Sequence, residues 1–179
     1  MYENLIYFFI AISLSMDAFS LALVYGTKKI SLKKKIILSI TVGIFHFVMP
    51  LLGAITGSKL FLKYLEFSDY LIGIIFIILS IEMLRDKEEI TIIKLKNIWS
   101  IFFFATTVSI DSFSVGLALS LREKTIFKAF LIFSITSCLF TMLGLKLGHK
   151  LSTYLAKKAN FLGGIILLII GLKYIFFNN

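Results

Sequence analysis

Two aspartates, Asp17 and Asp111, lie near the middle of two long apolar segments that contain no other charged residue. A carboxylate at bilayer depth costs roughly 2.5–3.5 kcal/mol on insertion scales. The two segments match one another, because Ser-Leu-Ser-Met-Asp-Ala-Phe-Ser at 13–20 resembles Thr-Val-Ser-Ile-Asp-Ser-Phe-Ser at 107–114. A chain that keeps two such carboxylates at equivalent positions is expected to use them together, as paired anionic ligands for a cation.

Hydroxyl side chains accompany each aspartate at helical spacing. Ser13 and Ser20 lie four residues before and three residues after the first aspartate. Thr107 and Ser114 hold the same places around the second. On a helix these positions share one face. Two such stripes that face one another would suit a hard divalent cation such as Mn²⁺, Mg²⁺ or Ca²⁺, which prefers oxygen ligands. The alternative is that both aspartates are protonated and hydrogen-bond neighbouring helices together.

His46 lies within another apolar segment, four residues before the only proline, Pro50. A lone histidine on an apolar helix is more often a satisfied core residue. The functional interpretation is a ligand or proton acceptor beside the aspartates, because imidazole titrates near neutral pH. Pro50 is expected to kink its helix and to free a backbone carbonyl. The candidate metal-binding residues are Asp17, Asp111, Ser13, Ser20, Thr107, Ser114 and His46.

The chain is too apolar for a soluble domain of its length. Of its 179 residues, 59% are hydrophobic and 16% are charged, and the mean hydropathy is +0.97. A helix that spans a bilayer needs about 20 residues. We predict an all-α integral membrane protein with six transmembrane helices, at 4–26, 36–58, 67–85, 99–121, 126–148 and 161–177. The amino-terminal residues lack the basic region of a signal peptide, so the first helix is expected to be retained.

Lysine and arginine are unevenly distributed among the predicted loops. Thirteen follow the first, third and fifth segments, five lie on the opposite side, and Lys173 lies within the last segment. By the positive-inside rule, the thirteen face the cytoplasm and both termini face outward. The net charge of +9 is therefore expected to orient the chain in the lipid bilayer. No basic patch interleaved with aromatic residues points to a nucleic acid partner.

The two halves of the chain align along most of their length. Each predicted unit holds three helices, an odd number, so the second unit must enter the membrane in the opposite sense. This arrangement, two inverted three-helix repeats with a binding site between them, is common in secondary transporters. We expect the first repeat at 1–86, a cytoplasmic linker at 87–98 and the second repeat at 99–179. The clearest matches pair Ser15 with Ser109, Phe19 with Phe113, Leu23 with Leu117, Gly53 with Gly144, and Gly57 with Gly148.

The sequence contains no nucleotide-binding loop, catalytic triad or paired-cysteine metal motif. We therefore predict neither enzyme activity nor a bound cofactor. The single cysteine, Cys138, cannot form an internal disulfide. The expected partners are a divalent metal ion, as transported substrate, and the lipid bilayer. The oligomeric state is left open, with a homodimer as one option.

At these residues the chain resembles the MntP-type manganese exporter family, within the wider LysE-like group of small exporters. The segments that carry the resemblance are 15–19, 43–53, 109–116 and 158–164. The resemblance extends over nearly the whole chain and implies six helices, residence in a bacterial plasma membrane and export of Mn²⁺. Members of that family often carry an acid or an amide at the position of His46 and an acid at the position of Asn160, so this chain has fewer carboxylates.

The leading hypothesis is a secondary exporter of Mn²⁺ in which Asp17 and Asp111 bind the ion. The two repeats would rock to expose it alternately, and its release would be linked to protonation of the aspartates. Three alternatives stay open. The segment 17–31 is also similar to a sister group of sporulation-associated membrane proteins, the chain could be a membrane scaffold with structural aspartates, or it could export another solute. An amino acid is less favoured as that solute, because no cationic side chain lies at mid-depth.

Overall fold

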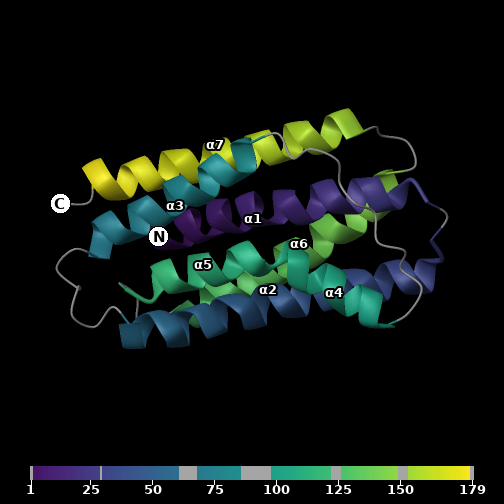
Figure 1. The fold of residues 1–179 in the computed structure, drawn as a ribbon, viewed down its shortest axis with the longest axis horizontal. Helices are drawn as coiled ribbons and strands as arrows, with labels where there is room; N and C mark the ends of the chain where they lie inside the picture. The colour runs from purple at the N-terminus through teal and green to yellow at the C-terminus, as the bar shows by residue number, and fades with distance from the viewer. Residues whose placement is uncertain are drawn as a thin grey trace.

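The computed structural model describes residues 2–28, 30–60, 68–85, 98–121, 126–148 and 153–177, and every regular element within these ranges is a helix. The helices are α1 (Tyr2–Gly26), α2 (Leu32–Leu60), α3 (Ser68–Leu84), α4 (Ile98–Val108), α5 (Ile110–Leu119), α6 (Ile126–Leu147) and α7 (Thr153–Phe176). The predicted all-α class is confirmed. The helices lie along the long axis of the molecule, and α1 begins at the end of the bundle where α7 ends (Figure 1).

Several helices in the described ranges are long and apolar enough to cross a membrane by themselves. These are the segments Leu5–Gly26, Leu32–Leu60, Ile126–Leu147 and Leu155–Phe176. The pair α4 and α5 counts as a fifth span if the two are taken together. The helix α3 has only 17 residues, about 26 Å at 1.5 Å per residue. The described residues therefore hold four to five candidate spans, and the predicted set of six is not confirmed.

The predicted span at 99–121 is not one continuous helix. The helices α4 and α5 meet at Ser109 with an angle of 42° between them, and Ser109 has φ −113° and ψ 5°. The Ser109 amide donates to the Thr106 carbonyl at 3.2 Å, which is the tighter i−3 pattern of a turn. No glycine or proline lies within α4 or at the break, so the usual sequence signals of a kink are missing. The break places Asp111 in the first turn of α5.

The start of the last helix differs from its prediction, and the predicted linker lies almost wholly outside the described residues. The last helix begins at Thr153, well before the predicted start at 161, so it is longer than the apolar pattern indicated. Lysines 157 and 158 lie in its first turns, and a hydropathy pattern does not reveal a helical segment that carries charged residues. The predicted linker at 87–98 lies outside the described residues, apart from Ile98, which begins α4.

Glycines allow helix backbones to meet in this bundle. A Cβ atom added to Gly144 of α6 would meet the Phe19 carbonyl oxygen and the Ala22 side chain, both on α1. A Cβ atom added to Gly53 of α2 would overlap the Phe113 carbonyl oxygen of α5. Small residues at helix interfaces permit this close approach in membranes. The helix α1 is therefore closely packed against α6, and α2 is closely packed against α5.

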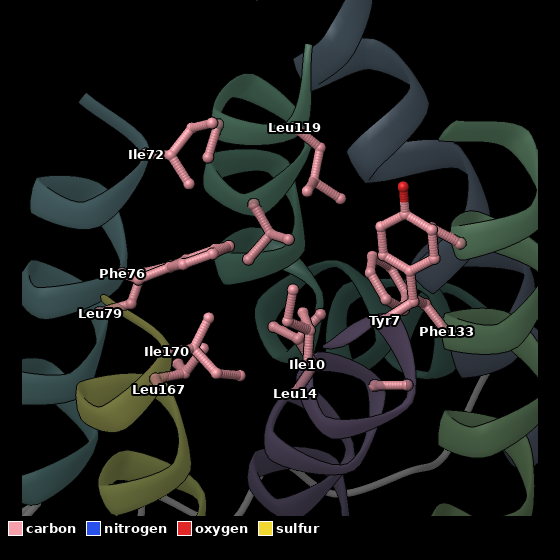
Figure 2. Packing of buried hydrophobic residues seen from close by; sticks show 14 of the residues in the cluster. Tyr7, Ile10, Leu14, Ile72, Phe76, Leu79, Leu119, Phe133, Leu167 and Ile170 are labelled. Carbon is pink, nitrogen blue, oxygen red and sulfur yellow. The ribbon is translucent and has the colours of Figure 1, made fainter. Parts of the chain in front are cut away.

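An apolar core joins α1, α3, α5, α6 and α7. Figure 2 shows Tyr7, Ile10 and Leu14 of α1 among side chains from the other four helices. Those labelled partners are Ile72, Phe76, Leu79, Leu119, Phe133, Leu167 and Ile170. All of these side chains are at most 7% exposed, so this core holds the amino-terminal half of α1 in place. From Ser13 to Ser20 the buried residues of α1 also include serines and Asp17, and these polar residues mark the candidate site.

Candidate ion-binding site

Asp17 lies in the second half of α1, a helix without a break, and its side chain is 7% exposed. The serines around it, Ser13, Ser15 and Ser20, are at most 1% exposed. Among the described residues, no other carboxylate is as deeply buried. Because burial of an unpaired charge is expensive, Asp17 needs a cation, hydrogen-bond donors or a proton in this position.

Ser13 and Ser20 direct their hydroxyls toward α7. The Ser13 hydroxyl donates to the Gly163 carbonyl at 2.6 Å, and the Ser20 hydroxyl donates to the Ala156 carbonyl at 2.8 Å. Ser20 also reaches the Met16 carbonyl, one turn back on α1, at 2.8 Å. Both serines therefore hold α1 against α7. Their predicted role as ion ligands stays a prediction.

Ser15, which the i−4 and i+3 spacing did not select as a ligand, faces a different helix. Its Oγ lies 2.6 Å from the Ala11 carbonyl and 3.0 Å from Oγ of Ser137 on α6. Since a carbonyl only accepts, Ser15 donates to Ala11 and accepts from Ser137. This contact places a hydroxyl pair between α1 and α6, two residues before Asp17. In the sequence, Ser15 was marked by its match with Ser109 in the other half of the chain.

The second aspartate has a different setting, created by the helix break. Asp111 is half-buried in the first turn of α5, and its Oδ1 accepts a hydrogen bond from the Ser112 amide at 2.8 Å. The amino-terminal end of a helix carries unsatisfied N–H groups and a partial positive charge, which together stabilise a carboxylate. The break thus provides a favourable place for a negative charge within the bundle.

The predicted stripe around Asp111 is interrupted by the same break. Thr107 precedes the bend, its side chain is exposed, and its hydroxyl donates to the Phe103 carbonyl at 2.9 Å. Ser114 follows the bend and is half-buried. Helical spacing fixes a common face only along a continuous helix, so it does not relate Thr107 to Asp111 here.

His46 lies beside the helix break. Its ring is fully buried on α2, and its Nδ1 lies 3.0 Å from the Val42 carbonyl oxygen and 2.8 Å from the Ser109 hydroxyl at the helix break. Nε2 is buried and has no hydrogen-bond partner. The ring is therefore satisfied at one nitrogen only, unlike an ordinary core histidine.

Other buried polar atoms also lack hydrogen-bond partners. Among the described residues these include Oγ of Ser112, Oγ1 of Thr141 and Oδ1 of Asn160. Thr141 lies one turn beyond Ser137 on α6. Asn160 lies on α7 between the two carbonyls that accept from the α1 serines, and so it is level with Asp17. Buried polar atoms are nearly always paired, so several unpaired ones near a buried carboxylate indicate a polar site rather than a packed core.

Within the described ranges, no group of three histidine, cysteine or acidic side chains lies close enough to hold a metal ion. Asp17, His46 and Asp111 therefore do not form a ready three-ligand site in this conformation. The buried imidazole instead contacts the serine at the helix break that precedes the second carboxylate.

The sequence matches a known family over most of its length. The sequence model described as "Mntp: Putative manganese efflux pump" matches residues 29–175. The chain belongs to this family. Membership confirms the resemblance to MntP-type exporters that the aspartate motifs indicated, and together with the apolar helices it makes the chain a multi-pass membrane protein.

Curated relatives named "Putative manganese efflux pump MntP" align with nearly the whole chain. The relative from Bacillus pumilus is 35% identical over 172 residues, which cover 93% of this chain and 91% of the relative. The relative from Geobacillus thermodenitrificans is 36% identical over 169 residues, or 93% and 92% of the two chains. The relative from Bacillus cereus (strain G9842) is 37% identical over 172 residues, again 93% and 92%. No solved structure matches the chain.

Proposed function

We propose that this chain is a secondary transporter that exports Mn²⁺ from the cytoplasm of a bacterium across its plasma membrane. The names of its relatives support the substrate and the direction. The observation that carries the proposal is a buried polar site in the bundle. Asp17 is buried among serines on α1, and buried His46 contacts the serine at the break that precedes Asp111.

The two carboxylates supply a charge that balances a divalent cation. In this proposal Asp17 and Asp111 bind the ion together, with neutral oxygens or water as the remaining ligands. Protonation of one or both carboxylates then releases the ion on the far side. Two nearby carboxylates titrate as a coupled pair, so proton uptake is a natural counterpart of ion release.

We further propose that the chain is built from two inverted repeats, at 1–86 and 99–179. Equivalent contacts support this. Gly53 faces the Phe113 carbonyl oxygen and the Leu117 amide nitrogen, and its counterpart Gly144 faces the same atoms of Phe19 and Leu23. The matched residues in the first helices differ by 94 positions in both cases. The first helix of each repeat thus packs in the same way against the second helix of the other.

A second set of contacts, between α3 and α7, supports the same symmetry. A Cβ atom on Gly73 would meet the side chain of Ile175, and one on Gly164 would meet the side chain of Leu84. In the proposed repeats, Gly73 corresponds to Gly164 and Leu84 to Ile175, each pair 91 positions apart. In this proposal α3 and the α4–α5 pair complete six membrane crossings, and both termini face outward.

The test is export by asparagine variants in cells that lack their own manganese exporters. Cells that express Asp17→Asn or Asp111→Asn should accumulate Mn²⁺ to the level of cells without the gene, measured as total cellular manganese after a manganese challenge. Asp69→Asn, which changes an acid in the first turn of α3, is the matched control and should export like the wild type. Immunoblots of membranes should show equal amounts of each protein.

Retained export by both single asparagine variants would refute a role for the aspartates in transport. That outcome would favour a scaffold protein with structural aspartates, in which glycine substitutions at helix contacts impair function and the aspartate variants do not. Accumulation of other metals, measured in the same samples, would show whether a different cation is the substrate.

A further inference from the structure

We propose that Nε2 of His46 is a direct ligand of the transported ion, and that it makes the site favour transition-metal ions over Mg²⁺ and Ca²⁺. This inference rests on the proposed function, because it requires an ion to bind beside Asp17. It adds a source of selectivity between metal ions, which two carboxylates do not provide.

The contact with Val42 favours a proton on Nδ1 of His46. Nδ1 lies 3.0 Å from the Val42 carbonyl oxygen and 2.8 Å from the Ser109 hydroxyl oxygen. A carbonyl oxygen can only accept a hydrogen bond, so the contact with Val42 is satisfied when Nδ1 carries the proton. In the neutral ring, Nε2 then carries the lone pair. This is the state in which imidazole binds a metal.

The lone pair on Nε2 has no protein partner. The ring is 0% exposed, and Nε2 is buried without a hydrogen bond. An unsatisfied buried polar atom costs about 1–3 kcal/mol, so such atoms need a reason. A bound cation would satisfy this nitrogen, because a metal ion accepts the lone pair of a neutral imidazole.

A nitrogen ligand changes which metal ions the site can distinguish. Carboxylate and hydroxyl oxygens bind Mg²⁺ and Ca²⁺ as well as Mn²⁺, because all three accept oxygen ligands. Imidazole is a poor ligand for Mg²⁺ and Ca²⁺, and its affinity rises along the first-row series from Mn²⁺ to Cu²⁺. His46 would therefore exclude the two abundant alkaline-earth ions, and would leave Co²⁺ and Zn²⁺ as effective competitors of Mn²⁺.

Ser109 acts in this scheme as a positioning residue. Its hydroxyl holds Nδ1 and lies at the junction of α4 and α5, so the ring orientation is tied to the helix break. Loss of an outer-shell partner of a metal-bound histidine typically costs about 10–100-fold in affinity. Ser109→Ala should weaken Mn²⁺ binding to this extent and leave the nitrogen ligand in place.

Pulsed electron paramagnetic resonance on the purified full chain tests the ligand directly. Mn²⁺ bound to the protein should show modulation from a directly coordinated ¹⁴N nucleus. The chain has two histidines, so His149→Gln is the matched control and should keep the modulation. His46→Gln and His46→Asp should lose it. The His149→Gln protein answers the question even if variants at position 46 do not fold.

Competition measurements on the same proteins test selectivity. Mn²⁺ binding is followed while Mg²⁺, Ca²⁺, Co²⁺ or Zn²⁺ is added. In the wild type, Co²⁺ and Zn²⁺ should displace Mn²⁺ at far lower concentrations than Mg²⁺. Because His46→Asp replaces a nitrogen ligand by an oxygen ligand, which suits Mg²⁺ as well as Mn²⁺, it should clearly reduce the preference for Mn²⁺ over Mg²⁺.

The outcomes separate this inference from the proposed function. If Mn²⁺ binds and binding depends on Asp17, but no ¹⁴N modulation from His46 is found, the ligand assignment is wrong and the exporter proposal stands. An unchanged preference for Mn²⁺ over Mg²⁺ in His46→Asp would likewise overturn the inference alone. If the wild type binds no Mn²⁺, or Asp17→Asn binds it equally well, both proposals fail.

Discussion

The two aspartates share a sequence motif but not an environment. Asp17 lies in an unbroken helix and is 7% exposed, with buried serines before and after it. Asp111 begins a new helix after a 42° bend, is half-buried, and accepts a hydrogen bond from the next backbone amide. One carboxylate lies within a continuous helix, and the other lies just after the junction of two helices.

This difference shows that two matched motifs need not play the same part. The partial positive charge at the start of α5 stabilises an ionised Asp111 without any ion. Asp17 lies within a continuous helix and has no such helix end beside it. We therefore expect the same substitution to affect export differently at the two positions.

Replacement of each aspartate by glutamate should reveal the largest difference between Asp17 and Asp111. Asp17→Glu adds a methylene to a close-packed site, where overpacking typically costs about 1–3 kcal/mol. It should lose most manganese export, as measured by cellular manganese content. Asp111→Glu enters a half-buried position and should keep a substantial part of export. Equal losses in both variants would mean that the two carboxylates are held with the same precision.

Glycine substitutions should show whether the two halves are equivalent in packing. Gly53→Ala and Gly144→Ala each drive a methyl group into a backbone carbonyl, so both should lower the melting temperature in detergent clearly. Gly164→Ala is the matched control, because its nearest neighbours are side-chain atoms of Leu84 and Met83 and not backbone atoms. A large effect at only one of the first two positions would argue against equivalent helix pairs.

The hydroxyls predicted as ligands should give the smallest effects. Ser13→Ala removes a hydrogen bond to α7, and such bonds in membrane proteins average about 0.6 kcal/mol. A slight fall in thermal stability with normal Mn²⁺ binding is the expected result. Thr107→Val changes an exposed side chain and should alter neither stability nor binding. A loss of Mn²⁺ binding in either variant would restore the stripe of ligands that helical spacing predicted.

Apolar segments and mid-span acids were enough to predict the helical membrane class. Hydropathy located α1, α2 and α6 to within a few residues, because uninterrupted apolar runs are directly visible. The start of α7 was missed because its first turns carry lysines, and hydropathy detects apolar segments only. The break at Ser109 was missed because neither glycine nor proline marks it.

The spacing around Asp17 identified polar residues but not their partners. Ser13 and Ser20 were chosen because they share a helix face with the aspartate, yet they hydrogen-bond to α7. Ser15 and Ser109, which lie two residues before each aspartate, make the contacts to α6 and to His46. Which face of a helix meets which neighbour is set by the packing of whole helices, and the glycine contacts that decide it are distant in sequence.

The glycine contacts also join the two halves of the sequence. Two helix pairs that meet through glycines, α1 with α6 and α2 with α5, each take one member from either half. Any movement of one half relative to the other must therefore pass through contacts that leave no room for a larger side chain.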